Sequence, residues 1–325
     1  MSLDTHAGTG AIPALPSNDP PQVSIDICTH DRAGLLAKCL ESVLSQSLPQ
    51  REFQVIVVDN NSGDDTRAVC DGFRGRFANF LYLHEPVQGI ARARNTGWRA
   101  AQAPLVAYLD DDELACDDWA EQLLRAARSQ PDAAVIGGES EPLFTTERPE
   151  WLTDRLLHHY SCCLRWSETP RFLQGAEWLA EGNCLYRRDL LAAYGGFPEE
   201  LGRRGSMLLS GEGAINDVLA AHGARSFFAP AARVRHLIDP ARLNTKWLAR
   251  RCFWGGITRA VVDDYLQERT GIGRPWRDLR LPAGVRDWEH LVNVMTDDNL
   301  NESLRKLHDL GYLLARTGLV EPQRL

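Results

Sequence analysis

The sequence lacks an apolar run long enough to cross a bilayer, which takes about 20 consecutive residues. It also lacks an excess of basic residues, because 36 Lys and Arg stand against 44 Asp and Glu, a net charge of −8. Nucleic acid, whose phosphates are bound by basic surfaces, is therefore not an expected partner. No basic segment followed by an apolar one opens the chain, so no signal peptide is predicted. These absences predict a cytoplasmic protein without a transmembrane segment, for which peripheral association with a membrane stays open.

Neither a C-x-x-C pair nor a zinc-ligand spacing occurs among the eight cysteines. Most of them lie within apolar segments, where a reduced thiol behaves as a small hydrophobic side chain. We therefore expect free thiols, without disulfides and without a structural zinc.

Two glycine-rich phosphate-binding loops are also missing. A Rossmann dehydrogenase needs G-x-G-x-x-G directly after its first strand, but here the first predicted strand is followed by Thr29-His30-Asp31-Arg32. The G-K-[ST] end of a P-loop is absent as well. The sequence thus disfavours both a nicotinamide cofactor and a P-loop.

What is present is an alternation of strand and helix patterns along the first half of the chain. The apolar run over 53–58 is continuous, which is typical of a strand buried on both faces. Short loops between the elements favour an α/β fold with a mostly parallel sheet, flanked by helices and joined by right-handed crossovers. The predicted strands are 23–28, 53–58, 80–83 and 105–109, and the predicted helices are 35–44 and 89–101.

The second half of the chain is less regular. Residues 139–177 are rich in Pro, Arg and Trp, and from Pro240 onward a helical pattern dominates. With 325 residues, the chain exceeds a typical single domain. We predict a flexible tail over 1–21, an α/β domain over 22–238 and a C-terminal helical region over 239–325.

An acidic triplet, Asp110-Asp111-Asp112, follows the predicted strand 105–109. Three adjacent carboxylates repel one another unless a positive group lies among them. Mg²⁺ and Mn²⁺ prefer oxygen ligands and often bind one or two carboxylates together with substrate phosphates. The carboxyl edge of a parallel sheet is also where ligands bind. The alternative interpretation is an acidic turn before a helix that begins near Asp117.

The order of several short motifs resembles family 2 inverting glycosyltransferases of the GT-A fold, of the kind that serves bacterial polysaccharide or glycolipid assembly. The likeness covers roughly residues 22 to 255, and the order and spacing of the motifs make it specific. The motifs are Thr29-His30-Asp31-Arg32, Val57-Val58-Asp59-Asn60-Asn61-Ser62, Gln88-Gly89 through Gly97, Leu109-Asp110-Asp111-Asp112, Glu181-Gly182-Asn183, Gly195-Gly196-Phe197, Leu209-Ser210-Gly211-Glu212 and Val234-Arg235-His236.

The resemblance implies a nucleotide-sugar site at the strand ends. Asp59 would accept a hydrogen bond from the base, and Thr29 and Arg32 would contact base, ribose or phosphate. Arg94 would lie near the nucleotide, with an arginine on the helix surface as the alternative. Asp110 would reach the ribose, and Asp111 is counted with the residues that bind the nucleotide.

The resemblance also implies a metal cofactor, Mn²⁺ or Mg²⁺. Asp112 would ligate the metal, which clamps the diphosphate and stabilises charge on the leaving group. His236 is the second predicted ligand, and an imidazole suits Mn²⁺ better than Mg²⁺. A histidine that is hydrogen-bonded within the core is the alternative.

The catalytic base is the point where the chain departs from the family. Relatives usually carry Glu-Asp or Glu-Glu after a glycine, and the second acid is the base, but here Gly213 follows Glu212. We therefore expect Glu212 to be the base. Asp217, one helical turn further along, is the alternative, and loss of the base is the third.

The expected reaction is transfer of a sugar from a nucleotide-diphosphate donor, a UDP-sugar by expectation, to a hydroxyl of a saccharide or glycolipid, with inversion. A nucleotide-sugar-binding subunit without activity and a sugar-phosphate nucleotidyltransferase are the alternatives. The latter needs a glycine- and lysine-rich loop after the first strand, which this chain lacks. Trp151, Trp166 and Trp178 either stack on acceptor sugar rings or anchor the irregular region.

Overall fold

The computed structural model of this chain describes residues 20–202, 211, 213–271 and 300–317. Its centre is an eight-stranded sheet with the strand order β3-β2-β1-β4-β9-β6-β10-β8. Neighbouring strands run parallel except β9, which is antiparallel to β4 and β6, and β8, which is antiparallel to β10. The predicted mostly parallel sheet is thus confirmed. The strands are β1 Val23–Thr29, β2 Phe53–Asp59, β3 Phe80–His84, β4 Leu105–Leu109, β6 Ala133–Gly137, β8 Arg171–Phe172, β9 Asn183–Arg187 and β10 Arg225–Phe228.

Helices cover both faces of this sheet. On one face, Leu36 and Leu123 pack with Ile25 of β1 in a single apolar cluster. On the other face, Leu191 and Ile215 pack with Val58 and its neighbours. The first face carries α1 Ala33–Leu44, α2 Thr66–Phe73 and α4 Trp119–Ser129, and the second carries α3 Ile90–Ala100, α5 Arg188–Tyr194 and α6 Ala214–Ala221.

A second, three-stranded sheet lies beside the carboxyl end of β4 and was not predicted. Its strands are β5 Glu113–Ala115, β7 Ser140–Phe144 and β11 Val234–Ile238, with β11 in the middle. His236 on β11 is opposite Glu113, and the Leu237 amide donates to the carbonyl of Asp112 at 2.8 Å. This pairing brings two predicted site residues, about 120 positions apart, to one place in the fold.

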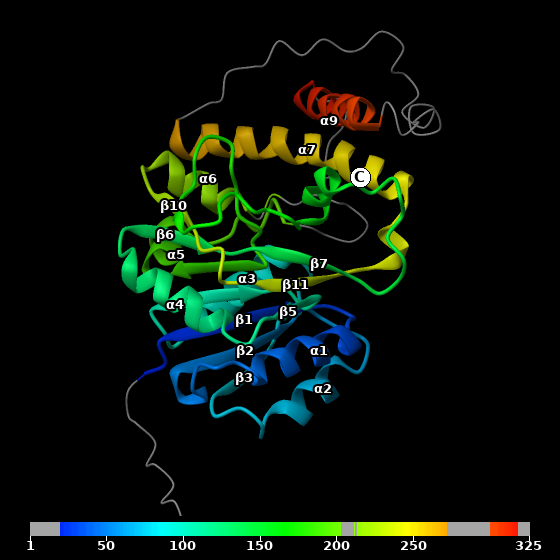
Figure 1. Ribbon diagram of the computed structural model, residues 1–325. Coiled ribbons are helices and arrows are strands. Elements are labelled where there is room, and N and C mark those ends of the chain that lie inside the picture. The colour runs from blue at the N-terminus through cyan, green and yellow to red at the C-terminus, as the bar shows by residue number, and fades with distance from the viewer. Residues whose placement is uncertain (1–19, 203–210, 212, 272–299, 318–325) are drawn as a thin grey trace, which may run out of the picture.

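The residues of the C-terminal region that the structure describes are mostly helical. Figure 1 shows α7 (Thr245–Thr270) and α9 (Leu300–Arg316) side by side across one end of the molecule, with α1 and α2 toward the other end. An apolar cluster joins α7 and α9 to the 3₁₀ turn η2 (Asp154–Tyr160). Two further 3₁₀ turns are η1 Gln50–Glu52 and η3 Pro240–Arg242.

Among the described helices, none is both long and apolar enough to cross a membrane. All eight cysteines lie in the described residues, and each is a free thiol.

Candidate active site

A cavity of about 540 Å³ opens at the carboxyl ends of β1 and β4. Its lining residues fall into three groups. The first group holds Thr29, Arg32, Arg94 and the acidic triplet, the second holds Trp178, Glu181, Gly182 and His236, and the third holds His159, Tyr160, Arg242, Trp247 and Arg251.

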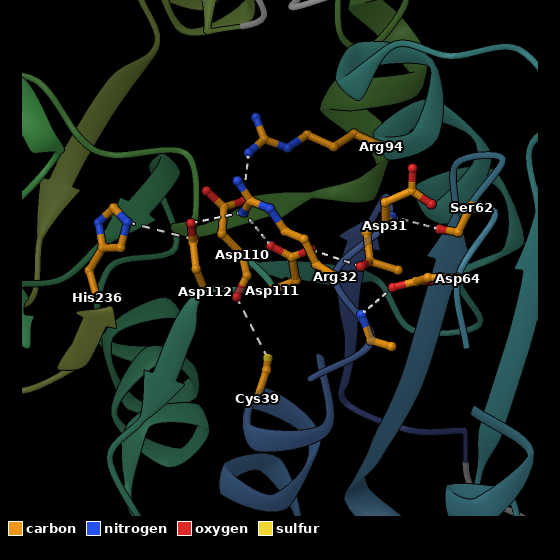
Figure 2. A network of polar contacts seen from close by, with 12 residues as sticks. Asp31, Arg32, Cys39, Ser62, Asp64, Arg94, Asp110, Asp111, Asp112 and His236 are labelled. Carbon is orange, nitrogen blue, oxygen red and sulfur yellow. Dashed lines mark hydrogen bonds and ion pairs between the residues drawn. The ribbon is translucent and has the colours of Figure 1, made fainter. Parts of the chain in front are cut away.

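The positive charge of Arg32 offsets the mutual repulsion of the acidic triplet. Arg32 Nη1 lies 2.9 Å from Asp111 Oδ1 and 2.9 Å from Asp112 Oδ2 (Figure 2). Thr29 Oγ1 donates to Asp111 Oδ2 at 2.7 Å. Burial raises the pKa of Asp111 to about 6, although Arg32 opposes the rise. The triplet therefore forms part of the cavity wall, and the guanidinium of Arg32 stabilises the ionised form of its carboxyl groups.

Arg94 contacts the triplet at Asp110. Its Nη2 lies 3.0 Å from Asp110 Oδ1, and its guanidinium lies over the rings of Tyr108 and Phe197. Arg94 is 3% exposed, so the alternative of an arginine on the helix surface is wrong. The Asp110 side chain is 42% exposed and faces the cavity, where it is accessible to a ligand.

His236 points its ring toward Asp112. Nε2 lies 3.6 Å from Asp112 Oδ1, is buried, and makes no hydrogen bond within the part of the chain that the structure describes. Nδ1 lies 3.6 Å from the Cys162 sulfur. Burial lowers the pKa of His236, but Asp112 and Cys162 outweigh it and hold that pKa well above its usual value. Burial likewise raises the pKa of Asp112, but His236 and Arg32 bring it below its ordinary value.

This pair fits a divalent cation. A buried imidazole nitrogen without a hydrogen bond, aimed at a carboxylate, is the donor set that a metal would satisfy. Among the described residues, however, no group of three His, Cys, Asp or Glu side chains is arranged to hold a metal alone. A cation here would therefore need ligands from the substrate as well, as Mg²⁺ does when it binds phosphates.

Glu113 is a further buried acid that the sequence analysis did not single out. Its Oε1 accepts a hydrogen bond from Ser140 Oγ at 3.2 Å, and burial, with the charge of Asp110, raises its pKa to about 8. Its position directly after the triplet could have indicated it, but nothing in the sequence shows that it is buried.

Asp59 lies at the end of β2 but does not line the cavity. Its Oδ1 accepts from the Ser62 amide at 2.9 Å, and its Oδ2 accepts from Tyr82 Oη at 2.7 Å. The next residue, Asn60, does line the cavity and accepts from the Gly89 amide at 2.8 Å. Recognition of the base by Asp59 stays a prediction. Through its bond to Gly89, Asn60 holds the loop that precedes α3.

The two predicted bases have different positions. Glu212 lies outside the described residues. Asp217 is on α6, where its Oδ2 lies 3.2 Å from Arg259 Nη1 of α7, and it does not line the cavity. Through this ion pair, Asp217 links α6 to α7.

The three tryptophans also differ in position. Trp178 is 38% exposed and lines the cavity. The Trp166 indole donates to the carbonyl of Trp178 at 2.7 Å, and Trp151 packs against the cluster that joins η2 to α7. Only Trp178 of the three is placed to stack on a ligand, and the sequence analysis missed the aromatic wall formed by Tyr160 and Trp247.

Comparison with known proteins agrees with this geometry. Residues 24–194 match the family model described as glycosyl transferase family 2. The chain belongs to this family and is a glycosyltransferase of the GT-A type.

A curated relative is the glucosyl-dolichyl phosphate glucuronosyltransferase of Haloferax volcanii, 29% identical over 86% of this chain and 88% of that protein. Two solved structures share the fold. The mannosyltransferase PcManGT of Pyrobaculum calidifontis, in complex with GDP-Man and Mn²⁺, has a TM-score of 0.56 and 17% identity over 95% of this chain and 83% of that chain. S. aureus TarS 1-349 in complex with UDP has a TM-score of 0.53 and 14% identity over 91% and 92%.

Proposed function

We propose that this glycosyltransferase moves a sugar from a nucleotide-diphosphate donor, a UDP-sugar by expectation, to a hydroxyl of a saccharide or glycolipid by inverting single displacement. The observation that carries the proposal is the buried Nε2 of His236, which faces Asp112 beside Asp110 and Arg32. This arrangement provides ligands for a cation and cations for a diphosphate in one cavity.

Asp112 and His236 are the residues that would hold Mn²⁺ or Mg²⁺, and a bound cation supplies positive charge to the leaving diphosphate. Arg32 lies on the same carboxylates with its side chain 32% exposed, so it can also turn toward a phosphate. Arg94 keeps the Asp110 carboxylate at the cavity, where it can accept from a ribose hydroxyl. Asp59 is proposed to accept from the base, because each of its oxygens has a second lone pair.

The acceptor is proposed to enter along the aromatic wall. Trp178 is exposed and lines the cavity, and Trp247 of the C-terminal region lines the same cavity. Aromatic faces pack well on the apolar faces of sugar rings. The name of the Haloferax relative supports a glycolipid acceptor. A cytoplasmic location and peripheral contact with a membrane remain predictions of the sequence.

A carboxylate must take the proton of the acceptor hydroxyl as its oxygen attacks the anomeric carbon. Glu212 remains the residue predicted from the sequence. Asp217 is the weaker of the two candidates, because its carboxylate is turned toward Arg259.

Calorimetric titration of UDP into the full chain, with and without Mn²⁺, tests the proposal. We expect Mn²⁺ to strengthen UDP binding, and Asp112→Ala or His236→Ala to reduce that gain by more than about 10-fold, as loss of a group at a metal centre does. Asp132→Ala, an exposed aspartate outside the cavity, is the matched control. UDP affinity that is the same with and without Mn²⁺ in the wild-type protein would refute the metal assignment.

A further inference from the structure

The resemblance to family 2 glycosyltransferases implies a catalytic acid at position 213, yet here it is glycine. Gly213 lies directly before α6, and a Cβ atom added to it would lie 1.9 Å from Oε1 of Glu181 and 2.8 Å from its Cδ. Real Cβ atoms essentially never come that close, so a side chain at 213 would require the Glu181 carboxylate to turn away from α6. The space beside α6 that a second acid would need is thus filled by an acid from another segment.

The loop before β9 carries Glu181 to this place. β9 pairs antiparallel with β4, with Asn183 opposite Leu109, so the loop lies beside the acidic triplet. A Cβ on Gly182 would lie 2.6 Å from Asp110 Oδ2 and 2.8 Å from Glu113 Oε2, so the loop passes close to these acidic side chains. Glu181 itself is half-buried and lines the cavity together with Asp110 and Trp178.

We propose that Glu181 is the general base of the transfer reaction and replaces the acid that Gly213 lacks. This inference rests on the proposed function and assigns the base that the reaction needs. The Glu181 carboxylate takes the proton of the acceptor hydroxyl while the acceptor oxygen bonds to the anomeric carbon. The bond from that carbon to the diphosphate breaks, and its electron pair leaves with the nucleoside diphosphate.

The alternatives are less well placed. Asp217 pairs with Arg259 and lies outside the cavity lining. For Glu212, the position in the sequence motif is the one argument for a role as the base. Glu181 lines the cavity, and its carboxylate also lies against Gly213, where the resemblance implies the base.

Donor turnover tests this assignment on the full chain. UDP-glucose, UDP-N-acetylglucosamine, UDP-glucuronate and GDP-mannose are offered with Mn²⁺, and release of the nucleoside diphosphate to water is followed for wild type, Glu181→Gln, Glu212→Gln and Glu168→Gln. We expect Glu181→Gln to lower kcat by about 10²–10⁴-fold and to remove the acidic limb of the pH profile, as loss of a general base does. UDP affinity with Mn²⁺ should be unchanged, and the exposed control Glu168→Gln should behave like wild type.

A swap of the acid sharpens the test. Glu181→Ala/Gly213→Asp removes the carboxylate that occupies the space beside position 213 and places an acid there, so it should recover part of the activity that Glu181→Ala loses. Thermal unfolding of each variant shows that it is folded.

Wild-type kcat in Glu181→Gln, together with an inactive Glu212→Gln, would overturn the inference and leave the proposed function intact. Loss of UDP binding in Glu181→Gln would also overturn it, because Glu181 would then bind the donor. No turnover of any of the four donors by wild type, together with no Mn²⁺-dependent UDP binding, would instead refute the proposed function.

Discussion

At the scale of single residues, the most unusual side chain outside the cavity is Asp26. It lies in the middle of β1 and is fully buried, with its Oδ2 1.9 Å from the place where a Cβ on Gly97 would be. Ile25 and Ile27 face the opposite helices. Burial raises the pKa of Asp26 well above 3.8, although Arg94 opposes the rise. Asp26 thus lies in the contact between β1 and α3, where burial favours the protonated form of its carboxyl group.

We predict that Asp26→Asn changes how stability depends on pH. A carboxyl whose pKa is raised by folding stabilises the protein below the pKa of the unfolded chain, and this stabilisation is lost as pH rises toward the folded pKa. Asparagine does not titrate, so the free energy of unfolding of Asp26→Asn relative to wild type should increase from about pH 4 upward, by on the order of 1 kcal/mol or more. Urea unfolding at several pH values measures this difference.

A difference between Asp26→Asn and wild type that is the same at every pH would contradict the prediction. Asp132→Asn is the matched control, because Asp132 is exposed and should give no such trend.

The sequence could identify most cavity residues but not their partners. Thr29, Arg32, Asp110 and Asp112 converge because parallel strands end at one edge of a sheet, which is a property of the backbone pattern. That Asp59 bonds to Tyr82 and not to the cavity depends on the packing of β2 against β3. The hydrogen-bond partner of a side chain depends on three-dimensional contacts, so the spacing of residues in the sequence does not predict it.

At the scale of elements, strands of the first half were predictable and those of the small second sheet were not. β1, β2, β3 and β4 carry long apolar or alternating runs, and their bounds agree with the prediction to within about two residues. β5 has three residues, and β7 contains Pro142. Strands as short as these form because β11 pairs with both of them, and pairing between distant segments leaves no local pattern.

The contact between α7 and α9 depends on two glycines. A Cβ on Gly256 would lie 1.8 Å from the carbonyl oxygen of His308, and one on Gly311 would lie 2.1 Å from that of Phe253. The two backbones therefore touch directly. The sequence predicted helices in this region, but it did not indicate which of their faces meet.

We predict that Gly256→Ala destabilises this helix pair. Because the added methyl group meets backbone atoms, the helices must move apart, and overpacking of this kind costs about 1–3 kcal/mol. The neighbouring substitution Gly255→Ala is the matched control, since its Cβ would lie 3.5 Å from His308 Cδ2, an ordinary contact. In Gly255→Ala, helix propensity alone should raise stability by roughly 0.5–1 kcal/mol. Thermal unfolding of both variants compares them, and equal stability would show that α7 and α9 adjust without cost.

At the scale of the whole molecule, the cavity joins the α/β domain to the C-terminal region. Trp247 of α7 stacks on Tyr160 of η2 with ring centroids 4.7 Å apart, and both residues line the cavity. Leu152 and Leu156 lie in one apolar cluster with Leu248 and Leu304. The sequence placed a boundary at 238 where the strand pattern gives way to a helical one, and such a change does not reveal whether the two parts share a core.

We predict that a chain ending at Ile238 does not form a stable fold. It would leave the cluster around Leu152 and Leu156 exposed to water. Each leucine that is no longer buried lowers the free energy of unfolding by roughly 1.5–3 kcal/mol. It would also lack the cavity wall formed by Arg242, Trp247 and Arg251, so it should not bind UDP with Mn²⁺. Size-exclusion chromatography and thermal unfolding, compared with the full chain, should show aggregation or a non-cooperative transition. If the shortened chain unfolded cooperatively at the Tm of the full protein, residue 238 would instead separate two units that fold independently, and the C-terminal helices would serve only to close the cavity.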